Sequence, residues 1–434
     1  MIIRGANWLT LVFVGLFVSM GLLVTGCDEG GGGGAVMMHH HRRPTPTATP
    51  TAAPPNACLP SSSLAVLVSG TNATVYAPQG SWGGGTAAVK VVPIETSGGI
   101  GTGAAPTTVV TGSIPNSCSS NSTTGTTVCT GNNTDVFLIN GTTLSSTVTS
   151  GATSTQNFSG GTCTNCGVVV DSTTNKALVA IGLSSGGPGG FQFLDLASNT
   201  FEAPIPVGTR TSEDASIDPI RHLVLSPNED QIYQILNTTT STAAVFNNSV
   251  SGELDSAGED CTTGIALSTI EFTGNLYIAD LTQAVFTPGT PGTWTDTASQ
   301  TQIFPEFASL SAGTNGIAIA PNSHLGIVVG EFGGNLEGVI QLPSTSGSGT
   351  PAVTDWVAFT VPNTPAAVAW QQGDDPHPVT AYVSPNSGKA FGVLENEEFT
   401  FLAVVDLQGL LLAPRTGHVV NDPLPAGVVT FIAE

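Results

Sequence analysis

Short apolar runs recur along the chain from residue 60 onward, and each is bounded by Gly, Asn or Pro. The fullest unit contains three such runs: Gly167–Asp171, Lys176–Ile181 and Phe191–Leu196. Val, Ile, Thr and Phe dominate the runs and helix formers are scarce, which is typical of short strands joined by tight turns. The pattern predicts an all-β domain over residues 61–434.

The same unit returns about every fifty residues. First strands are expected to start at residues 167, 214, 264, 316 and 380. In the copy at 264, Gly264–Leu267 is interpreted as the first strand, Asn275–Ala279 as the second and Gln283–Phe286 as the third. Units of this length with three or four strands fit the blades of a β-propeller. A solenoid would need shorter turns, and an immunoglobulin array would need longer modules with their own cores.

The two ends of the repeat region predict how the ring closes. Gly427–Ile432 has the pattern of another first strand, and Leu64–Val68 begins a group of strands near the start of the domain. Pairing of these two segments is expected to close the ring and to remove exposed sheet edges. Residues 107–150 give one weaker blade, with strands expected at Thr107–Val110, Thr126–Val128, Asp135–Ile139 and Leu144–Val148. Seven blades are expected, with six as the alternative.

The repeated unit is similar to that of the YVTN and NHL-type families of bacterial propellers, over most of residues 60–434. The Tyr-Val-Thr-Asn signature itself is absent, and Leu276–Asp280 is the nearest counterpart. The resemblance therefore implies an architecture and not an activity.

The first 26 residues have the features of an export signal. Arg4 precedes an apolar run from Trp8 to Val24 that ends in small residues. Leu23–Cys27 resembles the lipobox of bacterial lipoproteins, which implies cleavage before Cys27 and acylation (palmitate among the acyl groups) of that cysteine. Several acyl chains anchor a protein stably where one would be marginal. The alternative is an uncleaved transmembrane anchor, because about seventeen apolar residues nearly reach the spanning length.

Residues 27–60 are expected to form a disordered tether after the lipidated cysteine. They contain the glycine run Gly30–Gly34, the basic patch His39–Arg43 and a Pro/Thr/Ala stretch, none of which can bury a core. The expected location is the bacterial cell envelope, facing the periplasm or the cell surface, with the lipid bilayer as the partner of the acylated end.

The charge balance excludes one class of partner. The formal net charge is −22, from nine basic and thirty-one acidic residues. A nucleic-acid binder needs clustered Lys and Arg, whereas the basic residues beyond position 60 are scattered. Solubility is the simple explanation of the negative charge, and binding of divalent cations is the alternative.

Six cysteines besides Cys27 predict disulfides in an exported chain: Cys58, Cys118, Cys129, Cys163, Cys166 and Cys261. Cys118 and Cys129 bracket a Ser/Thr/Gly loop and are the most plausible pair, as a hairpin cross-link. Cys163 and Cys166 have the spacing of a redox motif but lack its βαβ context. Cys166 and Cys261 each precede an expected first strand, so they are expected on one face of the ring.

Carboxylates at the expected first strands are candidate ligands for Ca²⁺, which prefers oxygen donors. Two acidic pairs directly precede such strands and two aspartates end them: Glu213, Asp214, Glu259, Asp260, Asp171 and Asp218. This arrangement resembles the calcium-dependent lactonase and arylesterase propellers, which also place asparagines around the ion. The alternative is that these are solvated loop acids of an acidic protein.

The motifs of several enzyme classes are absent: G-x-S-x-G, H-E-x-x-H and the P-loop do not occur. No catalytic residue is assigned. The sequence favours a monomeric, non-enzymatic module that binds a protein, glycan or envelope partner. The alternative function is a calcium-dependent, lactonase-like hydrolase or lyase that uses an acidic channel mouth.

Overall fold

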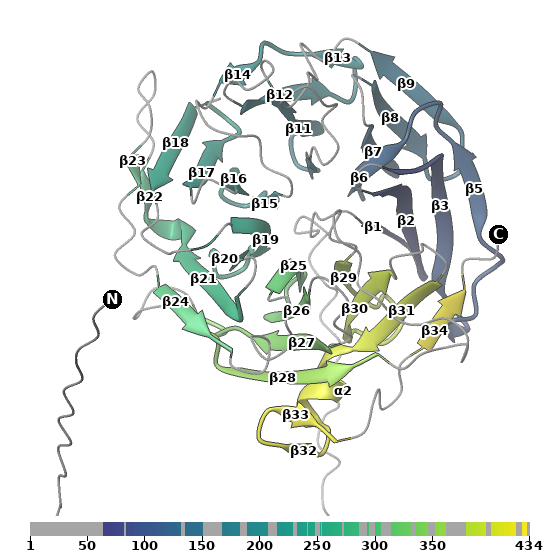
Figure 1. Ribbon diagram of the computed structural model, residues 1–434. Helices are drawn as coiled ribbons and strands as arrows, with labels where there is room; N and C mark the ends of the chain where they lie inside the picture. The colour runs from purple at the N-terminus through teal and green to yellow at the C-terminus, as the bar shows by residue number, and fades with distance from the viewer. Residues whose placement is uncertain are drawn as a thin grey trace, which may run out of the picture. The chain divides into compact units, whose positions relative to one another are not determined.

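A computed structural model describes the domain in segments: 64–81, 84–131, 135–150, 167–182, 189–206, 215–228, 232–240, 242–247, 252, 254–270, 273–285, 293–294, 300–304, 314–330, 336–345, 352–361, 379–395, 401–421 and 428–431. Seven antiparallel sheets surround a common axis as the blades of a β-propeller (Figure 1). The predicted fold class and the count of seven blades are therefore confirmed. The export signal, Cys27 and the tether lie outside the described residues.

The strands of a blade follow one another along the chain, and the first strand lies innermost. Blade 1 contains β1 (Ala65–Ser69), β2 (Asn72–Ser81), β3 (Gly84–Thr96), β4 (Gly99–Ile100) and β5 (Thr107–Val110). Blade 2 contains β6 (Pro115–Asn121), β7 (Thr126–Gly131), β8 (Asp135–Asn140) and β9 (Ser146–Ser150). Blade 3 contains β10 (Val168–Asp171), β11 (Lys176–Gly182), β12 (Gly189–Asp195), β13 (Thr200–Phe201) and β14 (Ile205–Pro206).

The second half of the ring repeats this order. Blade 4 contains β15 (Ser216–Asp218), β16 (Leu223–Asn228), β17 (Ile232–Asn237) and β18 (Thr242–Asn247). Blade 5 contains β19 (Leu254–Asp260), β20 (Ile265–Ile270), β21 (Asn275–Asp280) and β24 (Gln300–Ile303). Blade 6 contains β25 (Thr314–Ala320), β26 (Leu325–Gly330), β27 (Leu336–Gln341) and β28 (Asp355–Thr360). Blade 7 contains β29 (Val379–Val383), β30 (Ala390–Glu395), β31 (Phe401–Asp406) and β34 (Val428–Phe431).

The sheets are buried on both faces, which explains why their strands read as continuous apolar runs. In β25, Ile317 and Ile319 pack toward blade 5, whereas Ala318 and Ala320 pack toward blade 7. The described residues form seven core clusters, and each cluster fills the interface between two adjacent blades. No blade has a core of its own, so each is stabilised by its neighbours.

The predicted closure of the ring is wrong in its strand pairing. β34 pairs with β31 as the outer strand of blade 7, and β1 pairs with β2. The ring closes instead by side-chain packing: Leu64, Val66 and Val75 of blade 1 share a core with Tyr382 and Val404 of blade 7. We call this interface between blades 1 and 7 the seam. Apolar burial supplies the main driving force at the seam, because no strand is shared between the two blades.

Two strand assignments also need correction. The unit near residue 264 is out of phase, because Gly264–Leu267 lies in the second strand of its blade and β19 is the first. Thr107–Val110 forms β5, which pairs with β3 of blade 1, and the first strand of blade 2 is β6. Both missed first strands are polar (sequences LDSAGED and PNSCSSN) although they are buried. Their composition hid them from a search for apolar runs.

Two insertions cover outer strands of the preceding blade. The hairpin of β22 (Ala284–Val285) and β23 (Thr293–Trp294) follows the short helix η1 (Leu281–Gln283) of blade 5 and lies beside β18 of blade 4. After β31, helix α2 (Leu407–Leu412) leads into β32 (Arg415–Thr416) and β33 (Val419–Val420), and β33 pairs with β28 of blade 6. Covering an outer strand removes a template for unwanted pairing with another chain.

Cys118 and Cys129 form a disulfide between directly opposed residues of β6 and β7, as predicted. Cys261 is also disulfide-bonded, whereas Cys58, Cys163 and Cys166 lie outside the described residues. Cys261 follows the first strand of its blade and does not precede it, so the expected correspondence with Cys166 is wrong. Within the described segments, no helix combines the length and the apolar character needed to span a membrane.

Candidate functional site

One face of the ring carries the turns between the first and second strands of the blades, and we call it the hairpin face. In four consecutive blades the first strand ends in Asn or Asp: Asn121, Asp171, Asp218 and Asp260. Each side-chain oxygen accepts hydrogen bonds from backbone amides two or three residues later. These Asx turns replace backbone partners that the chain lacks where the strand ends.

The residue just before the second strand adopts a left-handed conformation in five blades. In blades 2 and 5 it is glycine, namely Gly125 and Gly264. In blades 3, 4 and 6 it is Asn175, His222 and His324, with φ of 55°, 57° and 59°. A residue with a Cβ strains the backbone by roughly 1 kcal/mol in this region. Three polar side chains therefore occupy positions where glycine would be easier to accommodate.

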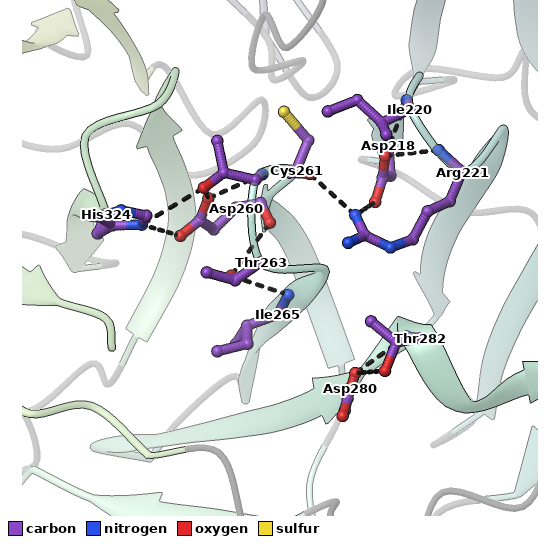
Figure 2. Close-up of polar contacts among 11 residues, drawn as sticks. Asp218, Ile220, Arg221, Asp260, Cys261, Thr263, Ile265, Asp280, Thr282 and His324 are labelled. Carbon is purple, nitrogen blue, oxygen red and sulfur yellow. Dashed lines mark hydrogen bonds and ion pairs between the residues drawn. The ribbon is translucent and has the colours of Figure 1, made fainter. Parts of the chain in front are cut away.

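These three side chains reach the strand-end residue of the preceding blade. Asn121 Nδ2 donates to Asn175 Oδ1 over 2.7 Å. His324 Nδ1 lies 2.6 Å from Asp260 Oδ2 (Figure 2). The equivalent distance between His222 Nδ1 and Asp171 Oδ2 is 3.6 Å. We call these contacts interblade pairs, since each joins the hairpin turns of two neighbouring blades.

Blades 4 and 5 are joined by a contact that runs in the opposite direction. Arg221 Nη1 donates to Asp218 Oδ2 over 2.6 Å and to the carbonyl oxygen of Cys261 over 2.8 Å (Figure 2). A Cβ on Gly264 would lie 2.8 Å from the guanidinium carbon of Arg221. Glycine at position 264 therefore avoids both the strain of the left-handed conformation and a close contact with the arginine.

The predicted carboxylates Asp171, Asp218 and Asp260 are thus brought to one face, and all three are buried. Each is held by an Asx turn, and Arg221 and His324 contact Asp218 and Asp260 over 2.6 Å, whereas His222 lies 3.6 Å from Asp171. No group of three or more His, Cys, Asp or Glu residues in the described segments is arranged to hold a metal ion. Glu213 and Asp214 lie outside those segments, so the predicted calcium site stays a prediction.

Glu259 is placed differently from the expectation. It belongs to the first strand β19 and does not precede one. Burial raises the pKa of its carboxyl well above the usual value, and the nearby Asp218 carboxylate acts in the same direction. Arg221 offsets this only in part. The surroundings of Glu259, between blades 4 and 5, therefore favour its neutral form, whereas Asp218 is paired with arginine.

The opposite face is where the first strands begin, and we call it the entry face. Three first strands open with a β-bulge, which spans Asn116 in β6, Asp255 in β19 and Asn315 in β25. All three side chains are buried, and Asn315 Oδ1 has no hydrogen-bond partner. Each residue stands five positions before the end of its strand. Sequence analysis missed this series, although the fixed distance was available as a signal.

The sequence position of Glu213 matches that series. It stands five residues before Asp218, the last residue of β15, as Asp255 stands five residues before Asp260. The two residue types in the series, Asn and an acid, both offer side-chain oxygens. The entry face therefore carries an oxygen-rich set of first-strand positions in blades 2, 5 and 6, while the hairpin face is cross-linked.

The chain connections are distributed unequally between the two faces. The turns between first and second strands are short, because β10 and β11 are separated by residues 172–175 and β19 and β20 by 261–264. Connections at the entry face are longer, for instance residues 151–167 between β9 and β10 and 361–378 between β28 and β29. Long connections held by a rigid scaffold are where proteins usually place recognition residues.

These features define a class, a seven-bladed β-propeller with a cross-linked hairpin face and long connections at its entry face. No protein-family model matches the sequence, and no curated protein matches it. Function is therefore argued from the residues of this chain.

Proposed function

We propose that this protein is a lipid-anchored module of the bacterial cell envelope that uses the entry face of its propeller to bind a protein, glycan or other envelope partner. The observation that supports the binding role is that the two faces of the propeller differ in their side-chain contacts and in their chain connections. The aspartates of the hairpin face hold the turns and the neighbouring blades. The longest connections between successive blades, residues 151–167 and 361–378, join strand ends at the other face.

The lipid anchor rests on the sequence alone. Leu23–Cys27 follows an apolar run and precedes a glycine-rich segment, and several acyl chains on Cys27 would give stable attachment. The test is metabolic labelling with an alkyne-bearing palmitate analogue in an expressing bacterium. The expected result is label on the full chain that is lost in Cys27→Ser, together with a shift of the variant out of the membrane fraction. Equal labelling of both chains would contradict the anchor.

The binding face is tested on the full chain with defined probes, which are purified peptidoglycan sacculi and an array of bacterial glycans. We expect replacement of residues 362–378 by a Gly-Ser segment of equal length to weaken binding at least tenfold. The control is Ile220→Ser, which changes an exposed residue of the hairpin face and is expected to leave affinity unchanged. If Ile220→Ser weakened binding and the replacement of residues 362–378 did not, the proposal of the entry face as the binding surface would be wrong.

A second candidate, calcium-dependent hydrolysis, is favoured by the bulged positions of the entry face. Asn315 Oδ1 is buried without a partner, and Asp255 occupies the same place in the preceding blade. Oxygen donors of this kind suit Ca²⁺. Titration calorimetry with CaCl₂ tests it, with Asn315→Ala expected to weaken binding and Asp260→Asn, on the hairpin face, expected to leave it unchanged. No heat of binding in the unmodified chain would remove this candidate.

A further inference from the structure

The seam differs from the other six blade interfaces because it joins the two ends of the propeller. Adjacent blades elsewhere follow one another along the chain, whereas blades 1 and 7 are held together across the seam without a shared strand. The seam is therefore the blade interface at which the ring can open without stretching a chain connection between successive blades. Its polar contacts determine how that opening responds to conditions.

Two carboxyl groups are buried in the seam, one toward each face. Glu95 of β3 is 1% exposed, and its Oε1 accepts hydrogen bonds from Ser384 Oγ and Asn386 Nδ2 over 2.5 and 2.8 Å. Glu395, the last residue of β30, is 0% exposed. Its Oε1 accepts one long hydrogen bond of 3.4 Å from Gln79 Nε2, and its Oε2 has no partner. Glu395 therefore accepts fewer and longer hydrogen bonds than Glu95 does.

Among the described residues, none that contacts Glu395 carries a positive charge. On β2 the facing group is Gln79, a neutral amide that also donates to the carbonyl oxygen of Ala77. On β31 the residue opposite Glu395 is Leu402, and the core beside it is apolar. The other titratable groups of the seam, Glu95 and Tyr382, lie toward the hairpin face. An ionised Glu395 would be a buried charge without a counter-ion, which destabilises the packed state.

We propose that the seam is an acid-locked closure: Glu395 holds blades 1 and 7 together as a neutral acid, and its ionisation loosens the ring at this interface. Burial raises the pKa of Glu395 well above the usual value, and the hydrogen bond from Gln79 opposes this only in part. The folded seam therefore binds a proton that the open seam releases. Its stability is fully present below the ordinary pKa of 4.5 and falls as the pH rises toward the folded-state value.

The consequence is a ring whose first blade becomes freer at higher pH. Blade 1 directly follows the segment proposed as the tether, so loosening acts on the part of the propeller next to the anchor. An envelope protein on the outer side of the cytoplasmic membrane experiences the pH of the surroundings, which makes such a response usable. The closure itself depends on the seam and not on the anchor, so it stands or falls separately from the proposed function.

The experiment is hydrogen exchange of the full chain at pH 5 and pH 8, corrected for the intrinsic pH dependence of exchange. We expect the opening of β1, β2 and β30 to increase at least tenfold between the two values, since one pKa unit corresponds to a tenfold change. In Glu395→Gln, a neutral side chain of similar shape, this increase is expected to disappear. Gln79→Met removes a donor that lowers the pKa of Glu395, so the folded-state pKa rises further and the loosening is expected to extend to higher pH.

The matched control is Glu259→Gln. Glu259 is also a buried carboxyl with a raised pKa, but it lies between blades 4 and 5, which are continuous in the chain. Its substitution is expected to leave the pH response of the seam strands intact. The proposal is overturned if Glu395→Gln retains the response, if Glu259→Gln removes it equally, or if the unmodified seam opens to the same extent at both pH values.

Discussion

At the scale of single residues, the hairpin face shows why strained positions are kept. His324 and His222 adopt positive φ angles where glycine would relieve the backbone. Each gains contact with a buried aspartate of the preceding blade. Removing the partner of a buried carboxylate costs about 1–3 kcal/mol, which exceeds the roughly 1 kcal/mol of strain. The stabilisation by the interblade pair therefore exceeds the cost of the strained backbone conformation.

This balance predicts an order of stabilities at position 324. His324→Ala keeps the strain and loses the pair, so it is expected to lower the free energy of unfolding by about 2 kcal/mol. His324→Gly loses the pair but relieves the strain, and about 1 kcal/mol of the loss should be recovered. Urea denaturation of both variants measures the difference. A glycine variant less stable than the alanine variant would contradict the argument.

The matched control is His222→Ala, at the equivalent turn of blade 4. Its Nδ1 lies 3.6 Å from Asp171 Oδ2, against 2.6 Å for His324 and Asp260. A hydrogen bond weakens steeply at the longer distance. The loss in His222→Ala is therefore expected to be smaller than that in His324→Ala.

At the scale of elements, the disulfide of blade 2 compensates for a polar first strand. β6 has the sequence PNSCSSN, so it contributes little apolar area, and Cys118 is joined to Cys129 on β7. The double variant Cys118→Ala/Cys129→Ala is expected to lose about 2–3 kcal/mol, because a loop of this length is no longer closed in the unfolded chain. Urea denaturation measures it. The control is Ser120→Ala/Thr127→Val, which removes the neighbouring hydrogen-bonded pair on the same strands and should cost less.

The β32–β33 hairpin is attached to blade 6 by an arginine. Arg415 donates to both carboxylate oxygens of Asp355 over 3.1 and 3.0 Å, and His418 stacks on Trp356. Burial raises the pKa of Asp355, but its hydrogen bonds with Arg415 outweigh this and the net pKa is lowered. The contribution of the pair is therefore present above the ordinary pKa of 3.8 and is lost as the pH falls through the lowered value.

Arg415→Met is expected to expose the hairpin at neutral pH. Hydrogen exchange at residues 415–421 should become faster in the variant, while exchange in β26 should not change. The unmodified chain should show the same loosening only at strongly acidic pH, where Asp355 is protonated. If the variant and the unmodified chain exchange alike at pH 7, the arginine does not hold the hairpin.

The same scale shows which elements could be predicted from the sequence. Strands β11 and β30 were predicted, as Lys176–Ile181 and Lys389–Leu394, because the residues that they bury form apolar runs within the strand itself. β6 and β19 were missed because their burial comes from neighbouring blades, and no local pattern records that. The interblade pairs were missed for the same reason, since His324 and Asp260 are far apart in sequence. The aspartates could be identified from the sequence as candidate site residues, but their histidine and arginine partners could not.

At the scale of the whole molecule, the position of β34 makes the closure of the ring testable. The sequence favoured a closing strand because Val428–Phe431 has the pattern of a first strand. Its pairing with β31 places it instead at the outer edge of blade 7. The seam core, which contains Leu64, Val92, Tyr382 and Leu402, does not depend on it. Removal of an outer strand leaves the ring closed, whereas removal of a closing strand would open it.

Truncation after residue 426 should therefore cost blade 7 one edge strand and leave the ring closed. We expect a folded monomer with a lowered melting temperature and faster hydrogen exchange in β31, whereas exchange in β1 and β2 should stay as in the full chain. Leu64→Ala, which removes apolar contact from the seam core, should instead speed exchange in β1 and β2, because a buried leucine contributes about 2–5 kcal/mol. If truncation loosened β1 as much as Leu64→Ala does, the C-terminal strand would be closing the ring after all.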